Sequence, residues 1–313
     1  MYTRLAANLA IGVALTTLAA TCGHNPPPAR PTVGGCAVLP SDNAWNTDIS
    51  RFPVASNSAA YISEIDNSGA TTLHPDFGSD PTYGIPYLVV PQNTANEPIN
   101  YTAYGDESDP GPFPIPPTAP IEGGASSTGD RHVLVVQQGA CHLYELGRAF
   151  WSNRDNRWNA DVGVNWDLSS NALRPLHYTS ADAAGLPILP GLARYDEVTA
   201  GAINHALRFT VEQTQHGFIA PATHDTGSST DATRPPMGLR LRLKTNFDLT
   251  PFHGESLVVL TALKKYGMIV ADNGSNWYIS GATDSRWNDD DLNQLKTVPG
   301  TAFEVVDTGP IQH

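Results

Sequence analysis

Three carboxylates lie close together in the segment YGDESDPGP, residues 104–112, as Asp106, Glu107 and Asp109. Carboxylates this close repel one another, and repulsion raises the pKa of at least one of them, as a general acid near neutral pH requires. Gathered carboxylates also bind calcium, although the EF-hand spacing is absent. A solvated acidic loop explains the same residues without any chemistry. Glu107 or Asp109 is our candidate general acid.

Two further acids stand at positions that suit a catalytic partner. Asp182 follows a serine and an alanine at a turn, and Asp272 ends the apolar stretch MIVA. Paired carboxylates cleave glycosidic bonds when one acts as acid and the other as base or nucleophile. Asp182 or Asp272 would be that second carboxylate. An Asx-turn with Asn273 and Gly274 explains Asp272 equally well.

The segment RYDEVTAGAINHALRFT, residues 194–210, predicts a helix that carries a histidine. Asp196 is a suitable N-cap residue. Val198, Ala202 and His205 are then spaced i, i+4 and i+7, on one face of the helix. His205 would face the core or a cleft, where it either reacts or is an ordinary buried histidine with both nitrogens hydrogen bonded.

A second histidine, His224, ends the apolar stretch FIAPAT and precedes a loop rich in glycine, serine and threonine. If strands at 207–213 and 218–223 formed a hairpin, His205 and His224 would lie at the same end of it. The pair would orient or tune the carboxylates, or hold a metal. We expect no metal site, because no HExxH motif or closed Cys/His ligand set occurs.

Several aromatic residues lie in polar surroundings that are typical of sugar binding. Stacking on rings and hydrogen bonding by nearby polar side chains is one use of such residues, and anchoring the core is the other. The candidates for substrate binding are Trp151, Trp158, Trp166, Trp277 and Tyr104.

The composition and the missing motifs exclude several classes of function. The net charge of −13 argues against nucleic acid and anionic membrane surfaces as partners, because both need a basic face. The chain has no GxSxG elbow, no SxxK followed by KTG, no GxGxxG and no P-loop. We expect no cofactor.

Many short strands and few helices predict a β-dominated α+β chain. An antiparallel β-sandwich or jelly-roll-like body with about three helices is the expected architecture. The alternation LRLRLK, residues 239–244, predicts a strand with its leucines inward and its basic residues in solvent.

The first 22 residues have one arginine followed by an apolar, alanine- and leucine-rich run, which is typical of a secretory signal. A Pro/Gly-rich tether would follow at 23–35, and a single β-rich domain at 36–313. The chain has three cysteines. We expect Cys36 and Cys141 to form a disulfide, and Cys22 either to carry a lipid or to be lost with the signal.

These features predict an exported carbohydrate-active hydrolase of the cell envelope or extracellular space. Its partner would be a polysaccharide or oligosaccharide, and it would reach a membrane only through a lipid on Cys22. A non-catalytic surface lipoprotein that binds polysaccharide is the main alternative. A metal-dependent hydrolase built on His205 and His224 is the third. The sequence does not indicate an oligomeric state.

Overall fold

The computed structural model describes residues 30–313, which form 15 β-strands, four α-helices and four short 3-10 helices. The predicted class, α+β and dominated by β-structure, is confirmed. The predicted signal segment at 1–22 and the lipidation candidate Cys22 lie outside the described residues.

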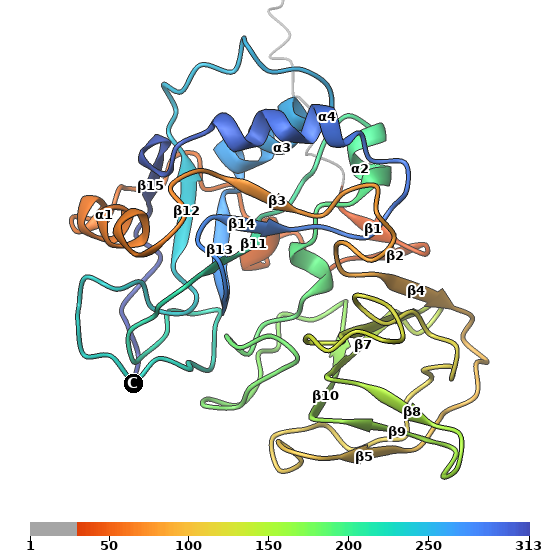
Figure 1. Ribbon diagram of the computed structural model, residues 1–313. Helices are drawn as coiled ribbons and strands as arrows, with labels where there is room; N and C mark the ends of the chain where they lie inside the picture. The colour runs from red at the N-terminus through yellow and green to blue at the C-terminus, as the bar shows by residue number, and fades with distance from the viewer. Residues whose placement is uncertain (1–29) are drawn as a thin grey trace, which may run out of the picture.

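A mixed six-stranded sheet forms the centre of the upper part of the molecule (Figure 1). β11 runs parallel to β13, and β14 runs parallel to β3, whereas the other neighbours are antiparallel. The sheet is therefore mixed and not, as the sequence led us to expect, antiparallel throughout. A parallel pair needs a crossover connection, and β12 and a helix form that connection between β11 and β13. In spatial order the strands are β15 (Phe303–Val305), β12 (Arg240–Leu243), β13 (Met268–Asn273), β11 (Leu207–Val211), β14 (Tyr278–Ser280) and β3 (His74–Asp76).

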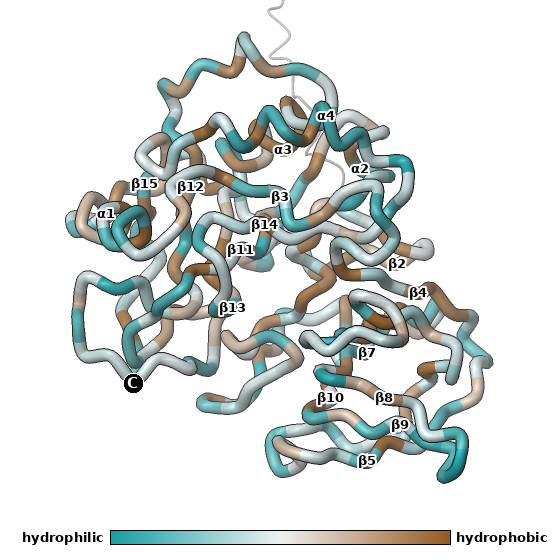
Figure 2. Tube along the Cα trace, viewed as in Figure 1, coloured by the Kyte–Doolittle hydropathy of each residue, from teal (hydrophilic) through white to brown (hydrophobic). Residues whose placement is uncertain are grey.

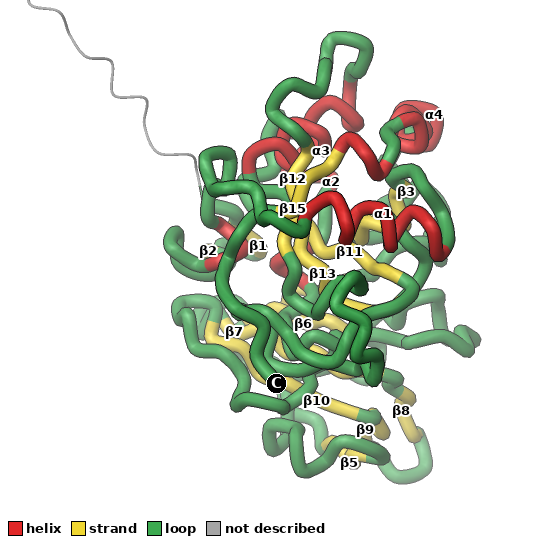
Figure 3. The backbone as a smooth tube through the Cα atoms, turned by 90° about the vertical axis from the view of Figure 1, so that its left-hand side faces the viewer, coloured by secondary structure: helices red, strands yellow, loops and turns green. Residues whose placement is uncertain are grey.

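All four α-helices lie beside this sheet (Figure 3). The longest, α3, has an acidic residue in its first turn and two lysines in its last, which complements the helix dipole. The hydropathy along the chain is shown in Figure 2; in α3 the run LVVL is apolar, and Val259, Leu260, Ala262 and Leu263 are buried. Among the described residues no helix is long and apolar enough to span a membrane. The helices are α1 (Ser58–Ser68), α2 (Tyr195–Thr199), α3 (Gly254–Lys265) and α4 (Asp289–Leu292).

Two smaller sheets are inserted in the chain between β3 and β11 and form the lower part of the molecule (Figure 1). In β6, Leu134 and Val136 face the main core, whereas Val133 and Val135 face a second core that includes Trp158. A small two-sheet sandwich thus exists here, but it is not the plan of the whole chain. One sheet has the order β10 (Val162–Asp167), β7 (His142–Gly147), β6 (Val133–Gln137) and β4 (Tyr87–Val90), and the other has β5 (Ile99–Tyr101), β9 (Arg157–Ala160) and β8 (Phe150–Ser152).

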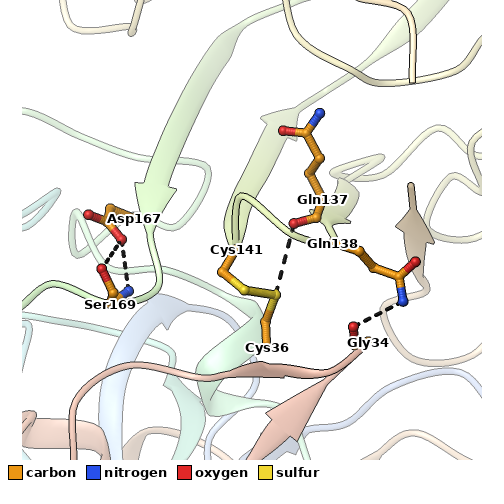
Figure 4. The surroundings of a disulfide bond; sticks show 7 residues. All are labelled: Gly34, Cys36, Gln137, Gln138, Cys141, Asp167 and Ser169. Atoms are coloured by element: carbon orange, nitrogen blue, oxygen red, sulfur yellow. Dashed lines mark hydrogen bonds between the residues drawn. A yellow bond between two sulfur atoms is a disulfide. The ribbon is translucent and has the colours of Figure 1, made fainter. Parts of the chain in front are cut away.

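A disulfide joins the inserted region to the start of the described chain. Cys36 and Cys141 are bonded at an S–S distance of 2.08 Å, as predicted (Figure 4). Cys36 belongs to a hairpin of β1 (Thr32–Val33) and β2 (Cys36–Ala37). Its two-residue turn has φ of 59° at Gly34 and 83° at Gly35, both in the region that such turns require. Part of the segment predicted as a tether is therefore folded.

The prediction that the basic residues of β12 face solvent is wrong. Arg240 and Arg242 are both buried. Arg240 donates hydrogen bonds to the carbonyl oxygens of Ala44 and Thr47, and Arg242 Nε lies 2.8 Å from Glu304 Oε1. The segment around Ala44 covers this face of the sheet, so both faces of β12 are enclosed.

Candidate functional site

The six-stranded sheet and the inserted region contribute charged side chains to one buried cluster. At its centre Arg208 binds Asp182 with two hydrogen bonds, from Nε to Oδ2 at 2.9 Å and from Nη2 to Oδ1 at 2.6 Å. Asp182 has no exposed surface. We define the Arg208 cluster as Asp76, Glu122, His132, Asp182, Arg208, Asp272 and Ser280.

Three members of the Arg208 cluster stand in a row on one face of the sheet. Asp76 in β3 is the register partner of Ser280 in β14. Ile279 is paired with Phe209 across the antiparallel β14–β11 pair, so Ser280 lies opposite Arg208. Arg208 Nη1 donates to Ser280 Oγ at 2.6 Å. Because side chains alternate along strands, Phe209 and Ile279 point to the opposite face, where they are buried in the main core.

Asp272, in the neighbouring strand β13, is the least well paired carboxylate near the arginine. Its Oδ2 lies 3.4 Å from Arg208 Nη2, and its side chain is 24% exposed. Burial, and then the nearby Asp182 carboxylate, raise the pKa of Asp272 to about 7, against the opposing effect of Arg208. Arg208 stabilises the ionised form of Asp272 weakly, since Asp182 already takes its two best-placed donors.

His132 and Glu122 form a second ion pair in the Arg208 cluster. His132 Nδ1 lies 2.6 Å from Glu122 Oε2, and Nε2 lies 2.9 Å from the carbonyl oxygen of Ala181. Both partners are acceptors, so both ring nitrogens carry protons. Burial alone would lower the pKa of His132, but the Glu122 carboxylate outweighs burial and raises it to about 9. The pKa of Glu122 is lowered, because the nearby His132 outweighs burial.

Asp76 is a carboxyl group of the Arg208 cluster that has no ion pair among the described residues. Burial raises its pKa, against smaller opposing effects of the Tyr83 hydroxyl and of Arg208. Asp272 can therefore hold or release a proton close to neutral pH, and the pKa of Asp76 is shifted in the same direction. Among the residues of this site, these two are suited to acid–base chemistry.

The structure brings two of the four predicted catalytic acids, Asp182 and Asp272, into the Arg208 cluster. Glu107 and Asp109 are held in other contacts. Asp109 Oδ1 lies 2.7 Å from Arg174 Nη1, and Glu107 Oε2 accepts a hydrogen bond from the backbone N–H of Thr179 at 2.7 Å.

The helix predicted through His205 ends much earlier, at Thr199. Gly201 has a φ of 88°, and its N–H donates to the Val198 carbonyl at 2.9 Å. The N–H of the next residue donates to the Glu197 carbonyl at 3.1 Å. This is a Schellman motif, in which glycine ends a helix by adopting a left-handed conformation. The glycine was a stop signal that the helical periodicity concealed.

His205 is nevertheless buried, and it contacts α2. Its Nδ1 lies 2.7 Å from the carbonyl oxygen of Ala206, and its Nε2 lies 3.0 Å from Glu197 Oε2. Arg194 Nη2 lies 2.6 Å from the other oxygen of Glu197. Arg194, and not Asp196, is the N-cap residue of α2. None of these partners of His205 belongs to the Arg208 cluster.

His224 lies next to the Arg208 cluster, and its hydrogen-bond partner differs from those of His205. Its Nδ1 is 2.7 Å from the carbonyl oxygen of Ala183, the residue after Asp182. The hairpin expected to bring the two histidines together does not form, because β11 pairs with β13 and β14 instead. Within residues 30–313 no group of three or more histidine, cysteine, aspartate or glutamate side chains is arranged to hold a metal ion.

Three of the predicted sugar-binding aromatic residues lie in the interior. Trp158, Trp166 and Trp277 are buried, so their rings contact protein and are not available to a ligand in this structure. Trp151 is half-buried, with its ring edge-on to Trp158. Tyr104 is exposed.

Sequence reasoning missed five members of the Arg208 cluster, namely Asp76, Glu122, His132, Arg208 and Ser280. A signal existed for Arg208, which interrupts the apolar run of HALRFTV and therefore needs a buried partner. Asp76 and Glu122 lie in short loop-like contexts that carry no pattern. No protein-family model, curated protein or solved structure matches this chain.

Proposed function

We propose that this protein is a hydrolase of glycosidic bonds whose chemistry takes place at the Arg208 cluster. One observation carries the proposal. Two of the four carboxylates each have a close ion pair, Glu122 with His132 and Asp182 with Arg208. Asp272 has only a longer contact of 3.4 Å with Arg208, and Asp76 has no ion pair among the described residues. Glycoside hydrolysis needs two carboxyl groups with separate roles, which different surroundings provide.

In this proposal Asp272 is the general acid. Burial and the neighbouring carboxylate raise the pKa of Asp272 to about 7, so much of it is protonated near neutral pH. Its proton passes to the leaving oxygen as the glycosidic bond breaks. Asp76 acts as the base that activates water or as the nucleophile that attacks the sugar carbon. Arg208, fixed by its ion pair with Asp182, positions Asp272.

This assignment takes the acid role from Glu107 and Asp109, which the sequence favoured. Both accept hydrogen bonds from protein donors. These contacts hold both side chains in interactions outside the Arg208 cluster.

We also propose that the protein is exported. The Cys36–Cys141 disulfide is compatible with an oxidising compartment, and the first 22 residues have the pattern of a secretory signal. A polysaccharide or oligosaccharide outside the cytoplasm is then the substrate.

The test is a reducing-end release assay with purified protein and a panel of plant, fungal and bacterial polysaccharides. We expect release by the wild type and a loss of about 100-fold or more in kcat for Asp272→Asn, as removal of a general acid produces. Asp290→Asn is the matched control, because Asp290 is exposed. Its turnover should equal that of the wild type.

Two results would overturn the proposal. Absence of release from every substrate, with retention of the protein on one of the same polysaccharides, would indicate a binding protein. Full turnover by Asp272→Asn together with loss of turnover in Asp109→Asn would return the acid role to the loop at 104–112.

A further inference from the structure

A cavity of about 610 Å³ lies between α1 and the β15 edge of the six-stranded sheet (Figure 3). This volume is within the range of about 300–1,000 Å³ that is typical of small-molecule sites. Ala59, Ile62 and Asp66 line the cavity from α1, and Lys244 and Phe303 line it from the sheet. We call it the α1 cavity. It contains no residue of the Arg208 cluster, which extends to β3 at the opposite edge of the sheet.

The sequence of α1 gives this cavity an apolar base and a polar rim. Ile62, Ser63, Asp66 and Asn67 lie on one face of the helix, because they are spaced i, i+1, i+4 and i+5. Ile62 is buried, as is Phe303 on the opposite wall. Asp66 is half-buried, whereas Ser63 and Asn67 are exposed. The cavity is therefore open to solvent at the rim and apolar at its base.

The α1 cavity contains two opposite charges that do not pair with each other. Asp66 Oδ1 accepts a hydrogen bond from Trp277 Nε1 at 2.9 Å, and Lys244 Nζ donates one to the carbonyl oxygen of Thr301 at 2.8 Å. Within residues 30–313 neither side chain forms an ion pair. Burial raises the pKa of Asp66, against the smaller opposing effect of the Trp277 indole. An ammonium group has three donors and a carboxylate about four acceptor sites, so both side chains can bind a further partner.

Glu304, which also lines the cavity, already has a close ion pair. Its Oε1 lies 2.8 Å from Nε of the buried Arg242. Asp66 and Lys244 are then the two charges that a ligand can pair with, and they sum to zero. An anion would be repelled by Asp66, and a cation would be repelled by Lys244. A molecule with one charge of each sign is attracted by both.

We propose that the α1 cavity binds a zwitterion with an apolar body, namely an apolar amino acid or short peptide with free termini. The ammonium group of the ligand binds Asp66, and its carboxylate binds Lys244. The apolar side chain packs on Ile62 and Phe303. Hydrogen bonds between oppositely charged groups are the strong ones, so they account for both affinity and orientation. This inference is independent of the proposed function, because no residue of the α1 cavity takes part in that chemistry.

Calorimetric titration of the purified wild-type protein with leucine, dileucine and trileucine tests the inference. We expect at least one of them to bind. The N-acetylated and the C-amidated forms of that ligand should each bind about tenfold more weakly, as loss of one hydrogen bond to a charged group produces. Binding of leucine would assign the cavity to amino acids, and binding of only the longer ligands would assign it to peptides.

Two variants assign the charges of the ligand to their partners. In Asp66→Asn the preference for the free over the N-acetylated ligand should vanish, whereas the preference for the free carboxylate should remain. Lys244→Gln should show the reverse. Asparagine keeps an oxygen that can accept from Trp277, so Asp66→Asn should retain the wild-type Tm. Asp290→Asn is the matched control, because Asp290 is exposed and lies outside the cavity.

Three results would overturn the inference. The first is that none of the three ligands binds to the wild type. The second is that the blocked forms bind as tightly as the free ones, a comparison that needs no variant. The third is that Asp66→Asn or Lys244→Gln, folded as judged by its Tm, keeps both preferences of the wild type.

Discussion

The two aspartates beside Arg208 differ because a single guanidinium can satisfy only one of them fully. Asp182 takes a bidentate pair of hydrogen bonds, whereas Asp272 has one contact of 3.4 Å. The geometry of one arginine thus divides two like residues into a fixed ion pair and a carboxyl group that titrates near neutral pH.

Removal of Asp182 should change the titration of its neighbour. In Asp182→Asn, Arg208 becomes free to bind Asp272, and a repelling charge is lost, so the pKa of Asp272 falls from about 7. We expect the alkaline limb of the pH–rate profile to move down by about one pH unit or more. The same limb measured in Asp290→Asn is the control. An unshifted limb in Asp182→Asn would show that another group is the acid.

Glu145 is a buried carboxyl group without a cation in contact. It accepts hydrogen bonds from the backbone N–H groups of Ile188 and Leu189 and from Trp166 Nε1. Burial nevertheless raises the pKa of Glu145 to about 7. The folded state therefore binds a proton more tightly than the unfolded state, and the free energy of unfolding falls as pH rises from about 4.5 to about 7.

The pH dependence of stability tests this role of Glu145. The free energy of unfolding should fall between pH 5 and pH 8 in the wild type. In Glu145→Gln this fall should be smaller by about 3 kcal/mol. Urea unfolding at both pH values measures the difference. Parallel pH dependence in the two proteins would mean that Glu145 is already ionised in the folded state at pH 5.

At the scale of elements, the local sequence pattern predicted the wrong length for one helix and the wrong exposure for one strand. Periodicity predicted α2 through His205, but the helix ends at Thr199, where Gly201 provides a left-handed residue. Alternation in β12 was real, yet Arg240 and Arg242 are buried because another segment covers them. Neither covering segments nor the choice between continuing and ending a helix is encoded in hydrophobic spacing alone.

Gly201 should be hard to replace even though it has space around it. No atom lies within 4 Å of a Cβ built there, so the cost of Gly201→Ala comes from its φ of 88° alone. We expect the free energy of unfolding to fall by about 1 kcal/mol. Gly129→Ala, where φ is outside the left-handed region and the nearest atom is 3.7 Å away, should change it by less than about 0.5 kcal/mol. Equal effects would remove the backbone explanation.

At the scale of the whole molecule, the Arg208 cluster exists because the inserted sheets pack against the six-stranded sheet. Glu122, His132 and Asp182 come from the insertion and its exit, whereas Asp76 and Arg208 come from the central sheet. The disulfide ties the insertion to the β1–β2 hairpin across a separation of 105 residues.

The disulfide should stabilise the fold without taking part in the chemistry. The double variant Cys36→Ala/Cys141→Ala should lose about 3–5 kcal/mol in the free energy of unfolding, because a long loop is no longer closed in the unfolded chain. Urea unfolding measures the loss, and the wild type in dithiothreitol should approach the variant. Identical midpoints with and without the bond would show that the insertion is held by packing alone.

The sequence by itself determined the features that depend on local pattern and on residue chemistry. These are the β-dominated α+β class, the strand at 239–244, and the Cys36–Cys141 pair. It also singled out Asp182 and Asp272. Only the tertiary structure decided that these two share Arg208, and that His132 and Asp76 join them. The physical reason is that a buried charge is defined by its partners, and these come from strands that are distant in the chain and adjacent only after folding.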